Sequence, residues 1–191
     1  MTAEHEPGAA PRPALGPCPV LPEPAKTLSA PAELLAGYLD FYRSEVLRKL
    51  DGLSEAELRS SRLPTGWTPL QLLKHLAYME RRWLQWSFAG EDIPEPFGDR
   101  GPGDRSPAEP WLVAEDETVT QIRAFYDAQS ARSREIAGAA QLSDRAVPAP
   151  RFAGSVPSLS WILFHVLQEY ARHAGHLDIV RELADGQADN D

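Results

Sequence analysis

The sequence predicts an all-α protein in which four long helices pack as one four-helix bundle. Apolar residues recur at spacings of three and four over four separate stretches, the pattern of helices that bury one face. Prolines and glycines fill the segments between these stretches, and no stretch shows a convincing alternation typical of strands. With 191 residues, of which 42% are hydrophobic and 25% charged, the chain is long enough for one domain with a sizeable core.

The predicted bundle spans residues 29–185 and lies between two segments of different composition. Residues 1–28 are rich in proline and alanine, and they predict an extended or disordered tail because proline interrupts helices. The alternative is that this tail lies along the surface of the bundle. This tail contains the one cysteine, Cys18, for which we expect no catalytic role. Residues 186–191 predict a short acidic C-terminal tail.

The first helix is predicted over residues 31–50, with a short helical turn after it. The second helix has the clearest beginning in the chain. Thr68 can cap its N-terminus, Pro69 suits the first helical position, and Gln71 completes a capping box. We expect this helix to continue to about Phe88, since Gly90 follows directly.

Residues 91–114 predict a long crossover loop, which contains five prolines and three glycines. About 24 residues can span the length of a ~30 Å bundle, so the second and third helices can run parallel. The result is an up-down-down-up order. The third helix is predicted over residues 117–139 and has the weakest apolar face, and the fourth is predicted over residues 158–183.

The histidines outside the N-terminal tail all lie on the second and fourth predicted helices. At ~100° per residue, His165, Glu169, His173 and His176 share one narrow stripe of the fourth helix. Glu169 and His173 lie closest to its apolar face, whereas His165 and His176 lie nearer its edge. His75 lies at the border of the apolar face of the second helix.

We therefore predict that His75, Glu169 and His173 hold one divalent metal and leave a position open for water or substrate. Imidazole and carboxylate ligands suit zinc, which we expect first, and also nickel, iron or manganese. His176 and His165 are candidate catalytic residues, as a base or as hydrogen-bond partners of the ligands. The alternative interpretation is that all are partly buried histidines satisfied by ordinary hydrogen bonds.

Several other side chains near this stripe call for an interpretation. Glu80 falls within the apolar arc of its helix, so we expect it to pair with an arginine, Arg181 being the first candidate, unless helix packing leaves it at a solvated edge. Arg82 and Arg172 border the predicted metal site and are candidates for binding a cosubstrate or an anionic substrate group. The apolar residues that flank His75 predict core packing or, alternatively, the wall of an apolar substrate pocket: Met79, Trp83 and Trp86.

Three stretches carry a resemblance to a known family: Gly66-Trp67-Thr68-Pro69 with the following residues 75–80, then residues 111–119, then residues 169–178. Over about residues 30–184 the chain resembles the DinB-like (DinB/YfiT) superfamily, in particular its actinobacterial mini-circle protein branch. The resemblance implies an up-down-down-up four-helix bundle whose metal ligands correspond to His75, Glu169 and His173. Many relatives have histidine at the position of Glu169, and the form with glutamate resembles the mycothiol-dependent maleylpyruvate isomerase.

The resemblance implies a metal-dependent thiol S-transferase that joins mycothiol to small electrophiles. A metal deprotonates a coordinated thiol, so such an enzyme needs no cysteine of its own. The alternatives are a metal-dependent hydrolase of a small molecule and a non-catalytic stress or ligand-binding protein with a vestigial site. The resemblance also implies a possible homodimer.

Charge and composition limit the partners. The net charge is −9 and no basic run is longer than Arg81-Arg82, so we expect neither nucleic acid nor an anionic membrane surface as a ligand. No stretch approaches the ~20 apolar residues of a membrane span, and the N-terminal residues lack the pattern of a signal peptide. We therefore expect a cytoplasmic protein that acts on a small molecule.

Overall fold

The computed structural model describes residues 14–16, 18–100, 110–148, 152 and 154–185. Its helical elements are α1 (Pro31–Leu50), α2 (Glu55–Leu58), α3 (Pro69–Glu80), η1 (Arg81–Phe88), α4 (Val119–Gly138) and α5 (Leu159–Asp185). Within these residues there are no strands, only the isolated bridges Arg100–Trp111 and Arg145–Ser158. The predicted all-α class is confirmed. None of the described helices is long and apolar enough to cross a membrane.

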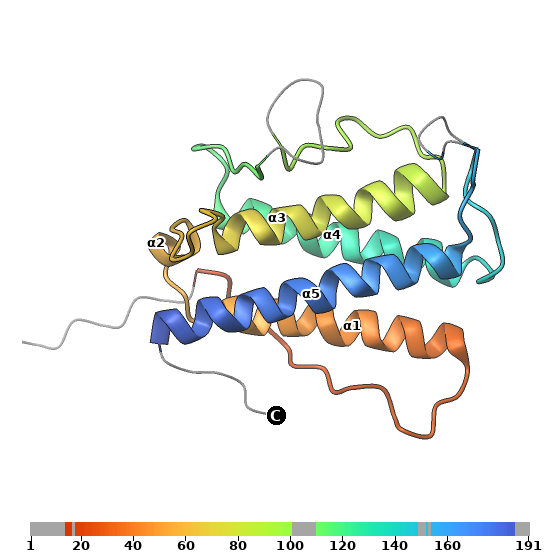
Figure 1. Ribbon diagram of the computed structural model, residues 1–191, viewed down its shortest axis with the longest axis horizontal. Coiled ribbons are helices and arrows are strands. Elements are labelled where there is room, and N and C mark those ends of the chain that lie inside the picture. Colours follow the sequence, from red (N-terminus) through yellow and green to blue (C-terminus); the bar gives the residue numbers. More distant parts are fainter. Residues whose placement is uncertain (1–13, 17, 101–109, 149–151, 153, 186–191) are drawn as a thin grey trace, which may run out of the picture.

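The long helices lie side by side, with their axes roughly aligned (Figure 1). α3 and α4 run in one direction, and α1 and α5 run in the opposite direction. α1 packs against α5, α3 packs against α4, and α3 also contacts α5. The core between them consists mainly of fully buried leucine, isoleucine and tyrosine side chains, among them Leu50, Leu72, Leu76, Tyr126, Leu159, Ile162, Tyr170 and Leu177.

The beginning of α3 has the predicted capping box. Thr68 Oγ1 accepts a hydrogen bond from the Gln71 backbone N–H at 3.2 Å, and Gln71 Oε1 accepts one from the Thr68 backbone N–H at 2.9 Å. These bonds satisfy backbone donors that have no partner within the helix, so they set where α3 begins. α4 begins with a second capping box, formed by Thr118 and Gln121.

The second predicted helix is not one regular α-helix. From Arg81 to Phe88 it continues as the π-helix η1, whose end is marked by a hydrogen bond from the Ala89 N–H to the Leu84 carbonyl at 2.9 Å. Within η1 the Gln85 amide donates to Gln129 Oε1 of α4 at 2.6 Å. π-helical turns are rare and occur often at functional sites, and nothing in the periodicity of this stretch predicted one.

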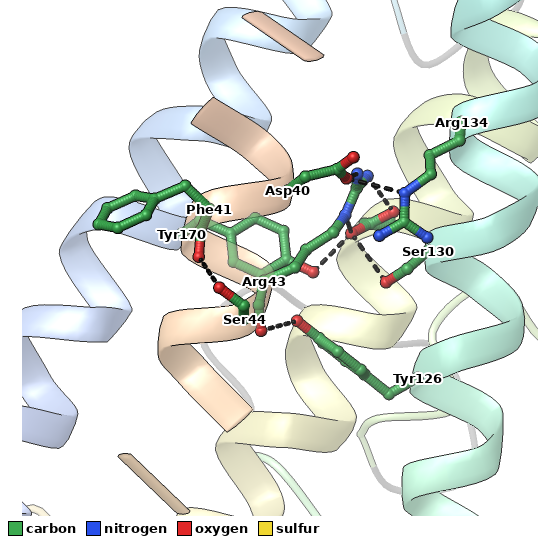
Figure 2. Close-up of polar contacts among 9 residues, drawn as sticks. Asp40, Phe41, Arg43, Ser44, Tyr126, Ser130, Arg134 and Tyr170 are labelled. Carbon is green, nitrogen blue, oxygen red and sulfur yellow. Dashed lines mark hydrogen bonds and ion pairs between the residues drawn. The ribbon is translucent and has the colours of Figure 1, made fainter. Parts of the chain in front are cut away.

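Glu80, at the end of α3, is fully buried in the middle of the helices and pairs with Arg43 of α1. Arg43 donates through Nε to Glu80 Oε1 at 2.8 Å and through Nη2 to Oε2 at 2.9 Å. The Tyr170 hydroxyl also donates to Glu80 Oε1. Figure 2 shows Arg43 and Tyr170 in this group of polar contacts.

The prediction that Arg181 is the partner of Glu80 is therefore wrong. Tyr170 is the α5 residue level with Glu80, and Arg181 lies eleven residues later, about 16 Å further along the helix. Arg181 Nη1 donates instead to the Asp51 carbonyl at 2.8 Å.

The part of the predicted N-terminal tail that the structure describes lies against α1 and α4. Leu15 is buried, the Leu21 N–H donates to Ser44 Oγ at 3.2 Å, and Cys18 lies 3.2 Å from Arg123 Nη1. Burial raises the pKa of the Cys18 thiol, although Arg123 opposes this shift. The remainder of this tail, the segment 101–109 of the predicted crossover loop and the acidic residues 186–191 lie outside the described residues.

Candidate functional site

A groove of about 900 Å³ lies between α3 with η1 on one side and α5 on the other. Residues of the loop between η1 and α4 form its third wall, among them Phe97, Arg100 and Trp111. The groove is also lined by every site residue predicted from the sequence: His75, Arg82, His165, Glu169, Arg172, His173 and His176.

The three predicted metal ligands meet in this groove. One donor atom each from His75, Glu169 and His173 lies within 4.8 Å of the others. Both histidines are buried and Glu169 is half-buried, with its Oε2 3.3 Å from His173 Nε2. On α5, Glu169 and His173 lie one helical turn apart and so point in similar directions. The packing of α3 against α5 places them opposite His75 of α3. Two imidazoles and one carboxylate fit zinc and similar divalent metals.

Asp99 orients the ring of His75. This carboxylate is completely buried, its Oδ2 lies 2.9 Å from His75 Nδ1, and its Oδ1 accepts a bond from Arg82 Nη1 at 2.6 Å. An ionised carboxylate only accepts hydrogen bonds, so His75 Nδ1 carries the proton and donates it. The Nε2 lone pair of His75 is therefore left to act as a ligand, an arrangement common among histidines that bind metals.

Trp111 covers one face of the same ring. Its indole stacks on His75 with 4.1 Å between ring centroids and 18° between planes, and it meets His173 edge-on at 5.3 Å. The Leu112 N–H donates to the Asp99 carbonyl at 2.8 Å, which ties the two parts of the loop together. His75 is thus fixed both along its edge and across its face.

Burial and hydrogen bonds together set the pKa values in the cluster, and burial has its largest effect on His75. It lowers the pKa of His75 to about 4, although the hydrogen bond to Asp99 partly opposes the shift, so the ring is neutral at pH 7. Burial alone would raise the pKa of Asp99, but His75 and Arg82 outweigh it and the net shift is downward. The hydrogen bond to His173 lowers the pKa of Glu169; burial opposes this shift, and the histidine charges add to it. A neutral His75 and an ionised Glu169 are the protonation states that metal ligands need.

The two candidate catalytic histidines lie at opposite ends of the groove. His176 Nδ1 is 3.3 Å from His173 Nδ1, and its ring lies 6.0 Å from that of Trp67. The His165 ring contacts Trp83, at 4.6 Å, and Trp161, which is parallel to it within 5° at 5.3 Å, and these two tryptophans also contact each other at 5.5 Å. Burial lowers the pKa of both histidines. Their catalytic roles stay predictions.

The two candidate arginines differ in their surroundings. Arg172 is exposed at the rim of the groove. Arg82 is mostly buried and bonded to Asp99, so it has a structural partner that the sequence did not predict. Binding of a cosubstrate or an anionic group by either residue stays a prediction.

Sequence reasoning missed Asp99 and the stacking role of Trp111. Both belong to the long loop, where no periodicity indicates which residues turn toward the helices. One signal was available, since long loops in compact domains are often functional, and a carboxylate in such a loop is a natural partner for a histidine ligand.

Comparison with known proteins identifies the family of the chain. No curated protein matches the chain significantly. A model of the mycothiol-S-transferase family matches residues 34–186, which include every residue of the groove discussed above. The match confirms the predicted resemblance to the DinB-like superfamily and its relation to mycothiol. The chain belongs to the mycothiol-S-transferase family.

Proposed function

We propose that this protein is a divalent-metal-dependent mycothiol S-transferase that acts on small electrophiles. The observation that carries the proposal is the convergence of His75, Glu169 and His173, whose donor atoms lie within 4.8 Å of one another in a large groove. The family indicates that the thiol is mycothiol. Two imidazoles and one carboxylate suit zinc first, with nickel, iron or manganese also compatible.

In this proposal His75 Nε2, the Glu169 carboxylate and one ring nitrogen of His173 hold the metal. A bound divalent metal lowers the pKa of a coordinated thiol, which makes the nucleophilic thiolate available at neutral pH. Asp99 keeps His75 in the tautomer that can act as a ligand. Trp111 limits the access of water to one face of His75. His176, beside His173, is the candidate for accepting the thiol proton.

The proposal also covers the helix order, the location and the oligomeric state of the enzyme. We infer a DinB-like four-helix bundle with up-down-down-up order, which the helix directions in Figure 1 support. A cytoplasmic location and a homodimer belong to the same proposal. Sedimentation equilibrium of the purified protein tests the dimer, since a single species at the monomer mass would contradict it.

The test combines metal analysis with a transferase assay. Protein purified without chelator is expected to contain close to one divalent metal per chain, and to consume an alkyl halide only when mycothiol is present. Glu169→Gln should lower both metal content and turnover at least tenfold, because the ligand loses its negative charge. Glu182→Gln, an exposed change on the same helix outside the groove, is the matched control.

Two results would contradict the proposal. Turnover of substrate without any thiol would indicate a hydrolase instead. Absence of stoichiometric metal, together with unchanged stability and metal content in His75→Ala, would indicate a vestigial site.

A further inference from the structure

The groove extends in both directions from the metal cluster along α5. His165 and His176 both line it, and they lie eleven residues, or about 16 Å, apart on the helix. Glu169 and His173 lie between them. The two substrates of a transferase must both reach the cluster, so the two ends of the groove are the natural places for the parts of each substrate that do not react.

One end, toward η1, is built from apolar and aromatic side chains, and we call it the aromatic end: Met79, Trp83, Phe97 and His165. The Trp83 ring meets His165 edge-on at 4.6 Å, Trp161 stacks on His165 at 5.3 Å, and the two tryptophans contact each other at 5.5 Å. Phe97 is held by the Arg82 guanidinium, 5.1 Å from its ring centre. These contacts hold the rings in place, so they form a rigid wall for a flat ligand.

The charged group beside the aromatic end, the Arg82 guanidinium, already has hydrogen-bond partners. The Arg82 guanidinium donates to Asp99 Oδ1 at 2.6 Å and also to the Pro96 carbonyl at 3.3 Å. A hydroxyl-rich molecule placed here would lose water against Met79, Trp83 and Phe97 and find few hydrogen-bond partners, which costs free energy. The carbohydrate part of mycothiol is such a molecule.

The opposite end has a different character, and we call it the polar end: Thr65, Gln71, Arg172 and His176. Thr65 and Arg172 are exposed, and Gln71 and His176 are half-buried. Hydroxyl, amide, guanidinium and imidazole groups can each exchange hydrogen bonds with sugar hydroxyls. Trp67 adds one aromatic face beside His176.

We propose that the aromatic end binds the electrophile and selects electrophiles whose reacting carbon is attached directly to a flat aromatic ring, while the polar end receives the carbohydrate part of mycothiol. The inference rests on the proposed function. The aromatic end lies about one helical turn from the candidate metal ligands. Met79 follows His75 by one turn and His165 precedes Glu169 by one turn, about 6 Å in each case. A ring seated there leaves room for about one carbon atom between the ring and the attacking sulfur.

The reaction with benzyl bromide serves as the example. The thiolate sulfur forms a bond to the benzylic carbon, the carbon–bromine bond breaks, and bromide leaves with the electron pair. The thiol proton is accepted by His176 in the proposed mechanism and then passes to solvent. No oxidant or reductant is needed.

The kinetic test compares benzyl bromide, 3-phenylpropyl bromide and butyl bromide, each rate being divided by the uncatalysed rate with mycothiol. Benzyl bromide is expected to show the largest enhancement, and the longer spacer should lower it about tenfold. Trp83→Leu should raise KM for benzyl bromide about tenfold and leave KM for mycothiol and the metal content unchanged. Trp83→Phe should restore most of the loss, and Phe164→Leu, an exposed change on α5 outside the groove, is the control.

A binding measurement separates this inference from the proposed function. The unreactive probe 4-nitrobenzyl alcohol is titrated into the metal-loaded protein without thiol, by calorimetry. Binding that is lost in Trp83→Leu, but kept in Phe164→Leu, supports the aromatic end even if no transferase activity is found. Equal enhancements for all three bromides, or a Trp83→Leu variant with unchanged KM and unchanged probe binding, would overturn the inference and leave the transferase itself intact.

Discussion

His75 is held by side chains from two parts of the chain that are distant in sequence. Asp99 fixes its Nδ1, Trp111 covers its face, and His173 meets its edge at 5.3 Å. A single ring thereby has its tautomer, orientation and solvent access all determined. A metal site depends on such partners nearly as much as on the ligands themselves.

Replacing Asp99 by asparagine should therefore weaken metal binding by about 10- to 100-fold. The asparagine amide can present its N–H to Nδ1, which favours the wrong tautomer of His75. Competition with a chelator of known affinity measures the effect. Asp92→Asn, an exposed change in the same loop, should leave the affinity unchanged, and equal affinities for all three proteins would show that Asp99 does not act on the ligand.

The stability of the metal-free protein should also depend on the protonation of His75. Burial lowers its folded-state pKa from 6.5 to about 4, so the unfolded chain binds a proton first as pH falls. The stabilising effect of a neutral His75 is fully present above about pH 6.5 and is lost as pH falls toward 4, by up to about 3 kcal/mol. Urea denaturation between pH 4 and pH 8 measures this loss. His75→Asn should flatten the curve over this range, and an unchanged slope would refute the assignment.

At the scale of elements, α3 and η1 position most of one wall of the groove. The capping box at Thr68 sets where α3 begins, and therefore where His75, two turns later, lies on the helix. The change to π-helical hydrogen bonding at Arg81 alters the direction of the residues that follow, among them Arg82 and Trp83. The capping box at the start of α3 thus sets the position of His75, and the change to η1 at its end sets the direction of the Trp83 side chain in the aromatic end.

Thr68→Ala should lower the free energy of unfolding by about 1 kcal/mol, because the Gln71 N–H loses its acceptor. Urea denaturation at constant pH measures the change. Thr68→Ser keeps the hydroxyl and should restore most of the stability. A loss of the same size in both variants would mean that the methyl group of Thr68, rather than its oxygen, is what stabilises the helix.

At the scale of the whole molecule, the pair Arg43–Glu80 joins helices that the sequence separates widely. Glu80 of α3 receives bonds from α1 and α5, and the Tyr126 hydroxyl of α4 donates to the Arg43 carbonyl at 3.2 Å (Figure 2). Burial raises the pKa of Glu80, but the Arg43 charge and hydrogen bonds outweigh it and lower the pKa overall. The buried pair therefore remains ionised. Because buried charges need their partners, the helices that carry these partners have to stay packed together.

Glu80→Ala should destabilise the protein by about 3–5 kcal/mol, because it leaves the Arg43 charge buried without its carboxylate. The double variant Arg43→Met with Glu80→Ala should recover a large part of this loss, since both charges are then absent. Urea denaturation of the unchanged protein, of Arg43→Met, of Glu80→Ala and of the double variant measures the coupling free energy between the two residues. Glu135→Gln, in an exposed ion pair with Arg132, should cost less than about 1 kcal/mol, and a similar cost for Glu80→Ala would contradict the buried-pair interpretation.

Local patterns were sufficient for the fold class and for the choice of His75, Glu169 and His173 as the candidate metal ligands that the structure brings together. Apolar spacing predicted the long helices, and the capping residues at Thr68 predicted the beginning of α3, because both signals depend on neighbours within a few residues. Glu169 and His173 could be preferred over His165 and His176 because helical geometry fixes relative directions along one helix.

The partners of these residues were decided only by the tertiary structure. Arg43 rather than Arg181 pairs with Glu80, since the level at which helices meet depends on packing and not on periodicity. Asp99 reaches His75 from a loop, where no repeat constrains direction. The sequence alone therefore determined which residues share a face of a helix, and the packed structure decided which faces and loops meet, because contacts between distant segments arise from burial and shape across the whole molecule.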